Sequence, residues 1–201
     1  MTAAWKAPVV GILMGAVLFG CALVVADALH PTPTDPYAST IEIPDGSGVV
    51  VADGYVLTAA HIARGWQEEG YDAGFVTFHP ELDVAVIEWP TDGKTAALLA
   101  RYWTKRGQEV SLVGIVQRRS EIHTRGHTGF LRERPGMSVH SCPAGPGTSG
   151  SPLFDTSGRV VGIHTGSYIY PLRGVAQIST AEFTFVEMAA IVGWIESVVG
   201  L

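Results

Sequence analysis

The sequence predicts an all-β fold of two small antiparallel β-barrels, with a helix at the C-terminus and a transmembrane helix at the N-terminus. Apolar residues make up 47% of the 201 residues and charged residues only 16%, so the chain can bury a substantial core. The 24 glycines and 12 prolines indicate many turns and disfavour a helical bundle. Between these turns, short apolar runs recur at a spacing that is typical of antiparallel barrels.

The first element is an uncharged apolar run at residues 8–26. At about 1.5 Å per residue, a helix of this length crosses most of a bilayer core of about 30 Å. Lys6 precedes the run and Asp27 follows it, so we expect a single-pass membrane anchor with a cytoplasmic N-terminus and an extracytoplasmic remainder. The motif Ala26-Asp27-Ala28 also suits the cleavage site of a signal peptide, which leaves secretion after cleavage as the alternative.

A proline-rich spacer follows the apolar run. Pro31, Pro33 and Pro36 favour an extended chain, so a domain boundary is expected there. The predicted division is an anchor and linker at 1–38 and a folded domain at 39–201, with lobe one at about 39–92, lobe two at about 107–178 and a C-terminal helix at about 181–199.

Lobe one is expected to begin with a β-hairpin. The apolar runs Val49–Ala52 and Tyr55–Thr58 flank an Asp-Gly pair at 53–54, which is a strong hairpin signal. The second run leads directly to His61. The rest of the lobe is predicted as a polar loop at 64–72 and two strands at 74–78 and 82–89.

Asp83 stands at the start of the last of these runs. A carboxylate in an otherwise apolar run is costly to bury unless it has a partner, so Asp83 is a candidate functional residue. Asp72 and Glu81, both in expected loops, are the alternative carboxylates.

Lobe two is expected to contain six strands, at 109–116, 121–132, 137–142, 152–154, 159–164 and 174–178. Ser179–Glu182 then fits a helix capping box, which predicts the C-terminal helix. Because Glu187 and Glu196 interrupt its apolar character, this helix is expected to pack against a lobe rather than to cross a membrane.

Charge and ligand-type residues narrow the classes of partner. The formal net charge of −6 offers no basic surface, so no nucleic-acid partner is expected. Cys21 and Cys142 lie in regions of different character and are not expected to form a disulfide. His123 and His127, and the looser pair His140 and Cys142, lack the spacing of a zinc site, so no metal is expected.

The segment Gly147–Pro152, which reads Gly-Thr-Ser-Gly-Ser-Pro, predicts a nucleophile loop. Such a glycine-rich turn can expose the Ser149 hydroxyl and direct backbone N–H groups towards one point. A base and an orienting carboxylate precede it, in the order His61, Asp83, Ser149. An α/β-hydrolase would show the order Ser, Asp, His and a glycine where Ser151 stands, so that class is disfavoured.

Together these motifs resemble those of trypsin/chymotrypsin-fold serine proteases of the compact bacterial and viral types, over about residues 47–178. The resemblance rests on Thr-Ala-Ala-His at 58–61 followed by Gly-Thr-Ser-Gly-Ser-Pro at 147–152. It implies two six-stranded barrels with the active site between them, an extended polypeptide as substrate and no cofactor.

The resemblance also implies a role for each motif residue. Ser149 would be the nucleophile, His61 the general base and then acid, and Asp83 the group that orients the imidazole. The backbone N–H groups of Gly147 and Ser149 would form the oxyanion hole.

His164 lies in Gly-Ile-His-Thr-Gly-Ser at 162–167, which resembles a motif of glutamate-specific bacterial proteases and of arterivirus-like and picornavirus-like proteases. The resemblance implies a specificity pocket formed by His164, Thr165, Gly166 and Ala144, in which the imidazole recognises Glu or Gln before the cut. Relatives commonly carry Thr or Ser at the position of Ala144, so a histidine that is merely packed in the pocket wall is the alternative.

The function predicted from the sequence is therefore a membrane-tethered serine endopeptidase that works through an acyl-enzyme. Two alternatives remain at this point: a non-catalytic peptide-binding module with a protease fold, and a membrane scaffold protein.

Overall fold

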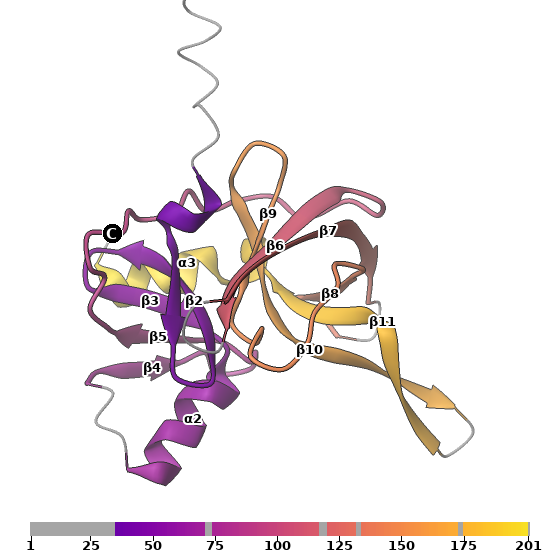
Figure 1. Cartoon of the computed structure of the whole chain (residues 1–201), viewed down its shortest axis with the longest axis horizontal. Coiled ribbons are helices and arrows are strands. Elements are labelled where there is room, and N and C mark those ends of the chain that lie inside the picture. The colour runs from indigo at the N-terminus through magenta and orange to yellow at the C-terminus, as the bar shows by residue number, and fades with distance from the viewer. Residues whose placement is uncertain (1–34, 71–73, 117–119, 132–133, 173–174, 201) are drawn as a thin grey trace, which may run out of the picture. The chain divides into compact units, whose positions relative to one another are not determined.

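The computed structural model describes residues 35–70, 74–116, 120–131, 134–172 and 175–200 (Figure 1). The predicted membrane anchor at 8–26 lies outside the described residues and stays a prediction. Within the described ranges, no helix is both long and apolar enough to cross a membrane.

The first lobe is a five-stranded antiparallel sheet that follows a short 3₁₀ turn, η1 (Pro36–Ala38). In spatial order its strands are β1 (Thr40–Ile43), β2 (Gly46–Ala52), β3 (Tyr55–Thr58), β5 (Ala85–Glu88) and β4 (Val76–Phe78). The predicted hairpin at Asp53 and Gly54 is confirmed as the β2–β3 turn. Gly54 has a φ of 74°, the left-handed conformation that such turns require.

The segment after β3 is a helix, α2 (Ala60–Glu69), so the polar loop predicted at 64–72 was wrong up to Glu69. Ile62, Ala63 and Trp66 are buried at helical spacing and pack against apolar side chains of the sheet. The helix ends at Gly70, whose φ is 77°. The described part of the first lobe is an open five-stranded sheet, not the six-stranded barrel predicted.

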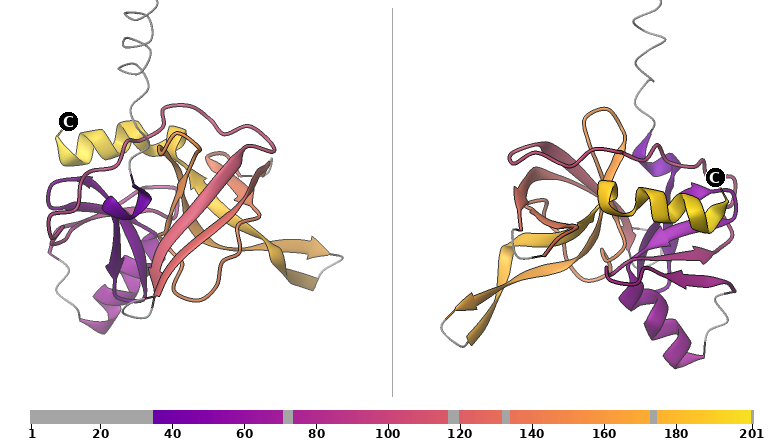
Figure 2. Two further views of the ribbon diagram at one scale, coloured as in Figure 1. Left: turned by 45° about the horizontal axis from the view of Figure 1, so that its top comes forward. Right: turned by 180° about the vertical axis from the view of Figure 1, so that it is seen from behind.

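The second lobe is a closed six-stranded barrel, as predicted. In spatial order its strands are β10 (Val160–Leu172), β11 (Val175–Glu187), β8 (Met137–His140), β7 (Ser120–Phe130), β6 (Glu109–Val116) and β9 (Pro152–Phe154). The bounds of β6 and β9 agree with the sequence prediction. Figure 2 shows the outer half of the β10–β11 hairpin extending beyond the barrel.

The last strand continues through the residues that were predicted to start the C-terminal helix. β11 reaches Glu187, and the helix α3 (Met188–Val199) begins there, so the capping box predicted at 179–182 was wrong. Phe183 and Phe185 are buried and alternate with a partly buried residue, which is the two-residue period of a strand. Pairing of this segment with β8 supplies the strand hydrogen bonds.

Helix α3 packs against both lobes. The prediction that it packs against a lobe is therefore confirmed. Ile191 of α3 belongs to one apolar cluster with Val49 and Val86 of the first lobe and Val113 of the second. At the start of the helix, the buried carboxylate of Glu187 accepts hydrogen bonds from the backbone N–H and hydroxyl of Thr104 in the interlobe connection. The two lobes are therefore held in a fixed relation.

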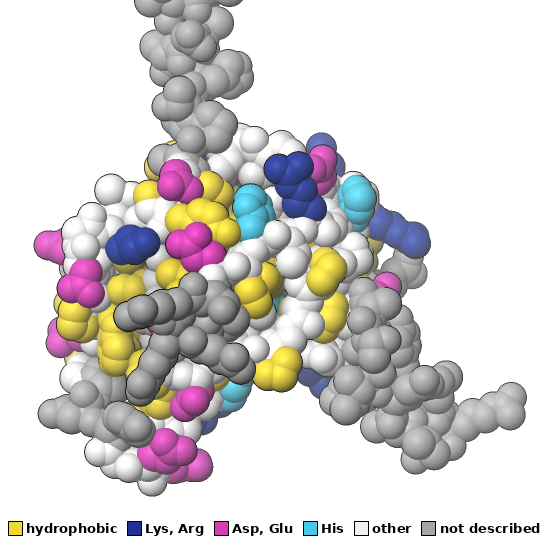
Figure 3. All heavy atoms as spheres, in the orientation of Figure 1, with side chains coloured by type: hydrophobic (Ala, Val, Ile, Leu, Met, Phe, Trp, Pro, Cys, Tyr) yellow, Lys and Arg dark blue, Asp and Glu magenta, His cyan; other side chains and the backbone are white. Residues whose placement is uncertain are grey.

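The charged side chains are distributed unevenly over the surface. On the face shown in Figure 3, Asp and Glu lie mainly over the first lobe, whereas Lys and Arg lie mainly over the second. That face therefore presents no continuous basic surface.

Candidate active site

His61 lies in the first turn of α2, immediately after β3. Ala59 is still extended and α2 starts at Ala60, so the chain changes from strand to helix just before His61 and leaves its side chain 42% exposed. Nδ1 of His61 is 2.7 Å from Oδ2 of Asp83. The backbone N–H of His61 donates to Oδ1 of the same carboxylate at 2.9 Å. Both carboxylate oxygens of Asp83 therefore accept a hydrogen bond from the same residue, His61.

Asp83 lies in the loop that leads into β5 rather than inside the strand. Its backbone carbonyl accepts a hydrogen bond from Ala60 N at 3.2 Å, and its side chain is 32% exposed. The nearest cation is Arg64, whose Nη1 is 4.0 Å from Oδ1. Since the carboxylate accepts the Nδ1 proton, Nε2 of His61 is left with a lone pair and can act as a base.

The predicted nucleophile loop is a tight turn that depends on glycine. Thr148 closes it with hydrogen bonds from N and Oγ1 to the Gly145 carbonyl, at 3.1 and 2.6 Å. Gly147 and Gly150 have φ values of 86° and 80°, which only glycine adopts readily. Ser149 itself is partly buried.

This loop is attached to the first lobe through Ser47 of β2. The Ser47 N–H donates to the Ser149 carbonyl at 2.9 Å, and the Ser47 carbonyl accepts from Thr58 Oγ1 at 2.8 Å. A β-carbon at Gly150 would lie 2.0 Å from the Ser47 carbonyl oxygen, so the two backbones approach closely. Thr58 lies three residues before His61, and the loop is therefore held beside the end of β3, the strand that leads into α2 and His61.

The structure does not join Ser149 to His61 by a side-chain hydrogen bond. In the described part of the chain, the Ser149 hydroxyl has no hydrogen bond to the imidazole. Catalytic hydrogen bonds are often long before substrate binds. The N–H groups of Gly147 and Ser149 also take part in none of the backbone hydrogen bonds found among the described residues, so both are available to an oxyanion.

His164 of β10 lies directly beside the nucleophile loop. Its carbonyl accepts from Gly150 N at 2.8 Å, and its N–H donates to the Ser151 carbonyl at 2.9 Å. The ring is 3% exposed. Burial first, and then the charge of His61, lower the pKa of His164 from 6.5 to about 4.

His140 is a functional candidate that the sequence prediction treated only as a poor metal ligand. Its Nε2 is 3.0 Å from Nδ1 of His164, and its ring is 1% exposed and stacked on Phe183. Burial also lowers its pKa well below the ordinary value. The sequence feature that could have identified His140 is strand alternation, which places it on the same inward face as the buried Ser138.

The other residues of the predicted specificity pocket lie in β10 directly after His164 and in the loop before Ser149. Thr165 and Gly166 follow His164 along β10 and are joined to Thr184 of β11: the Thr165 and Thr184 hydroxyls are 3.1 Å apart, and Thr184 Oγ1 donates to the Gly166 carbonyl at 3.2 Å. Ala144 lies partly buried in the loop five residues before Ser149 and offers no side-chain polar group.

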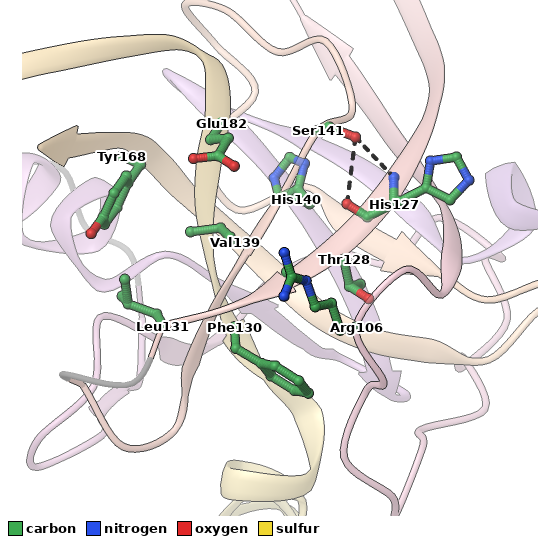
Figure 4. A pocket seen from close by; sticks show the side chains of 11 residues that line it. Arg106, His127, Thr128, Phe130, Leu131, Val139, His140, Ser141, Tyr168 and Glu182 are labelled. Carbon is green, nitrogen blue, oxygen red and sulfur yellow. Dashed lines mark hydrogen bonds between the residues drawn. The ribbon is translucent and has the colours of Figure 1, made fainter.

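A separate cavity of about 560 Å³ opens beside the buried histidine pair (Figure 4). It is lined in part by His140 and by Arg106, Phe130, Tyr168 and Glu182. None of His61, Asp83 and Ser149 lines it, so this cavity is distinct from the predicted catalytic residues.

Residues 46–163, more than half of the chain, match the family model of the trypsin-like peptidase domain. Protease Do-like 1, chloroplastic, of Arabidopsis thaliana is 32% identical over an alignment of 158 positions, which covers 64% of this chain and 35% of that protein. The chain spans about a third of the length of the curated relatives that it matches.

Solved structures share the fold. Rv3671c from M. tuberculosis, in an inactive form, aligns with a TM-score of 0.61 at 18% identity, over 85% of this chain and 91% of that chain. The HtrA-type protease AlgW, solved with a decapeptide, aligns with a TM-score of 0.57 at 22% identity, over 77% of this chain and 51% of that chain.

Proposed function

The chain belongs to the trypsin-like peptidase domain family, and from this premise we propose that it is a serine endopeptidase with His61, Asp83 and Ser149 as its catalytic triad. The observation that carries the proposal is the double hydrogen bond between His61 and Asp83, which fixes both the ring and its tautomer. The attachment of the Ser149 carbonyl to Ser47 supports the position of the nucleophile.

In the proposed reaction, Nε2 of His61 takes the Ser149 proton as Oγ attacks the scissile carbonyl carbon. The negative charge that develops on the carbonyl oxygen is stabilised by the N–H groups of Gly147 and Ser149. His61 then passes the proton to the leaving amine, which breaks the peptide bond and leaves Ser149 acylated. Water, deprotonated by His61, attacks the acyl carbon and releases the product and the serine.

The test is covalent labelling by a fluorophosphonate probe, together with cleavage of an unstructured protein. The wild type should be labelled and active, whereas Ser149→Ala should be neither. Ser157→Ala is a matched control, because Ser157 lies exposed in the turn after β9 and, within the described part of the chain, forms hydrogen bonds only with Asp155. Peptide binding by an unlabelled wild type would favour the non-catalytic module instead.

We further propose a preference for Gln or Glu before the cut, supported by the histidine pair. Nδ1 of His140 is buried with no hydrogen-bond partner among the described residues. An enclosed lone pair is more tolerable than an enclosed N–H, so His140 is expected to donate from Nε2 to Nδ1 of His164. His164 then carries its proton on Nε2 and can donate to a side-chain carbonyl.

In this proposal, the same pair compensates for the alanine at position 144. Where relatives use a hydroxyl there, His140 supplies the polar partner of His164. Because both rings are uncharged near neutral pH, the amide of Gln is expected to be favoured over the charged carboxylate of Glu. A peptide-library cleavage profile should show this preference in the wild type and lose it in His164→Ala. An unchanged profile would remove the proposed role.

The substrate is proposed to be an extended polypeptide, in line with the relative AlgW solved with a decapeptide. We also propose an extracytoplasmic domain tethered through residues 8–26, with secretion as the alternative. The support is the apolar run in the sequence and a 30% identical relative named as a probable periplasmic endoprotease. If the chain were only a membrane scaffold, deleting residues 1–36 would abolish its function, whereas a protease should still cut a soluble peptide.

A further inference from the structure

His79 holds together the loop that carries Asp83, through both its backbone and its side chain. This loop runs from the end of β4 to the start of β5. The backbone N–H of His79 donates to the Val84 carbonyl at 3.0 Å and joins the two ends of the loop. Between these ends, Asp83 projects from the sheet towards His61.

The His79 ring is partly buried and accepts two hydrogen bonds from the loop. Nδ1 is 3.2 Å from the N–H of Glu81 and 3.1 Å from the N–H of Leu82. These are the two residues directly before Asp83, and neither N–H is bonded by the sheet. A side chain four residues upstream therefore holds the backbone just before Asp83, and the hydrogen bond from Ala60 N to the Asp83 carbonyl holds it on the other side.

Only a neutral ring can make these contacts, because a lone pair on Nδ1 must face both N–H groups. Burial lowers the pKa of His79, although the nearby Glu81 carboxylate acts in the opposite direction. On its other side, the ring meets the Trp194 indole of α3 edge to face, with centroids 5.1 Å apart. The ring therefore has an acceptor contact with the loop and a separate packing contact with the C-terminal helix.

We propose that His79 is a positioning residue for catalysis, whose Nδ1 holds the loop in the one conformation from which Asp83 reaches both Nδ1 and the backbone N–H of His61. The inference rests on the proposed function, because it assigns the consequence of the contact to turnover. Without the acceptor, the N–H groups of Glu81 and Leu82 must find water, and the loop relaxes away from α2. His61 then loses the group that fixes its tautomer.

Two substitutions separate the acceptor from the packing contact. His79→Asn retains a side-chain acceptor at nearly the position of Nδ1 and removes the ring. His79→Phe retains a ring against Trp194 and removes the acceptor. A purely structural role would make the asparagine variant the worse one, since it loses the packing against α3.

The experiment measures kcat and KM of the full chain on one peptide, with the melting temperature of each variant. We expect His79→Phe to lose about 10²-fold in kcat with KM little changed, as a misplaced catalytic group does. His79→Asn should keep kcat near the wild-type value even if its melting temperature falls. Equal kcat in both variants, or losses that follow the melting temperature, would overturn the proposal.

A second readout distinguishes failure of this inference from failure of the proposed function. The proton shared between His61 Nδ1 and Asp83 is observable by proton NMR as a far-downfield resonance. It should persist in the wild type and His79→Asn and disappear in His79→Phe, whether or not the protein cuts peptides. A wild type that shows the resonance but is neither labelled nor active would contradict the protease proposal alone. Persistence of the resonance in His79→Phe would contradict the role of His79.

Discussion

His140 and His164 form a hydrogen-bonded pair of buried imidazole rings beside the nucleophile loop. Two buried rings of this kind cannot both be charged without a large desolvation cost, and burial lowers the pKa of each. The pair therefore stays neutral in the folded protein over a pH range in which free histidine becomes protonated.

The free energy of unfolding should fall as the pH is lowered from about 6.5 towards about 4, the pKa values of unfolded and folded His164. In this window the unfolded chain binds a proton that the folded chain does not, so acid favours unfolding. The slope from one such histidine approaches about 1.4 kcal/mol per pH unit. Urea denaturation at a series of pH values measures it.

His164→Phe is the control for this prediction, since it keeps a ring of similar size and removes the titrating group. Its stability should depend less steeply on pH in the same window. An equal slope in the variant and the wild type would assign the acid sensitivity to other groups.

At the scale of elements, the nucleophile loop is positioned by close contact between backbones rather than by side chains. Ser47 of β2 lies against the Ser149 carbonyl, and Gly150 leaves no room for a β-carbon beside Ser47 and Thr58 Oγ1. The loop also pairs with β10 through the two backbone hydrogen bonds of His164. A small change in this loop is therefore expected to move the nucleophile relative to the first lobe.

Gly150→Ala should abolish most turnover and lower the melting temperature. The added β-carbon would lie 2.0 Å from the Ser47 carbonyl oxygen, and the φ of 80° is unfavourable for alanine. We expect a loss of at least about 10²-fold in kcat from displacement of the nucleophile. Steady-state kinetics and fluorophosphonate labelling rates measure it.

Gly145→Ala, in the same loop, is the matched control. A β-carbon there meets no atom within 4 Å, and Gly145 is not among the glycines with positive φ. This variant should keep nearly full activity. If it lost as much activity as Gly150→Ala, the loop would be sensitive to any substitution, and the contact with Ser47 would not be the cause.

At the scale of the whole described domain, α3 joins the lobes. Its buried residues share one apolar cluster with strands of both lobes, and Arg101 in the interlobe connection forms an ion pair with Glu196 of the helix. The lobes are therefore expected to unfold together rather than one after the other.

Ile191→Ala should lower the free energy of unfolding by about 2–5 kcal/mol, because it leaves a cavity where α3 meets both lobes. The transitions followed by tryptophan fluorescence and by circular dichroism should coincide in the wild type. Gly193→Ala, at an exposed helical position with no atom within 4 Å, should instead raise stability by about 0.5–1 kcal/mol. Separate transitions in the wild type would contradict joint unfolding.

The order of His61, Asp83 and Ser149, the β2–β3 hairpin and the bounds of β6 and β9 were all predictable from the sequence, whereas β10 and β11 are much longer than predicted. They depend on local features: turn residues, two-residue alternation and short motifs, each complete within a few positions. The same features misplaced the start of α3, because a capping-box pattern at 179–182 lies in a segment that pairs with neighbouring strands. Local helix propensity is weak and tertiary pairing overrides it.

What the sequence by itself determined is thus which residues are the candidates for the proposed chemistry and in what order they occur. Only the tertiary structure decided that the first lobe stays an open sheet covered by α2, that His140 is the partner of His164, and that His79 closes the loop of Asp83. The physical reason is that two of these features depend on contacts between separate elements and one on the exact turn of a loop. A hydrogen bond between side chains 24 residues apart leaves no periodic trace along the chain.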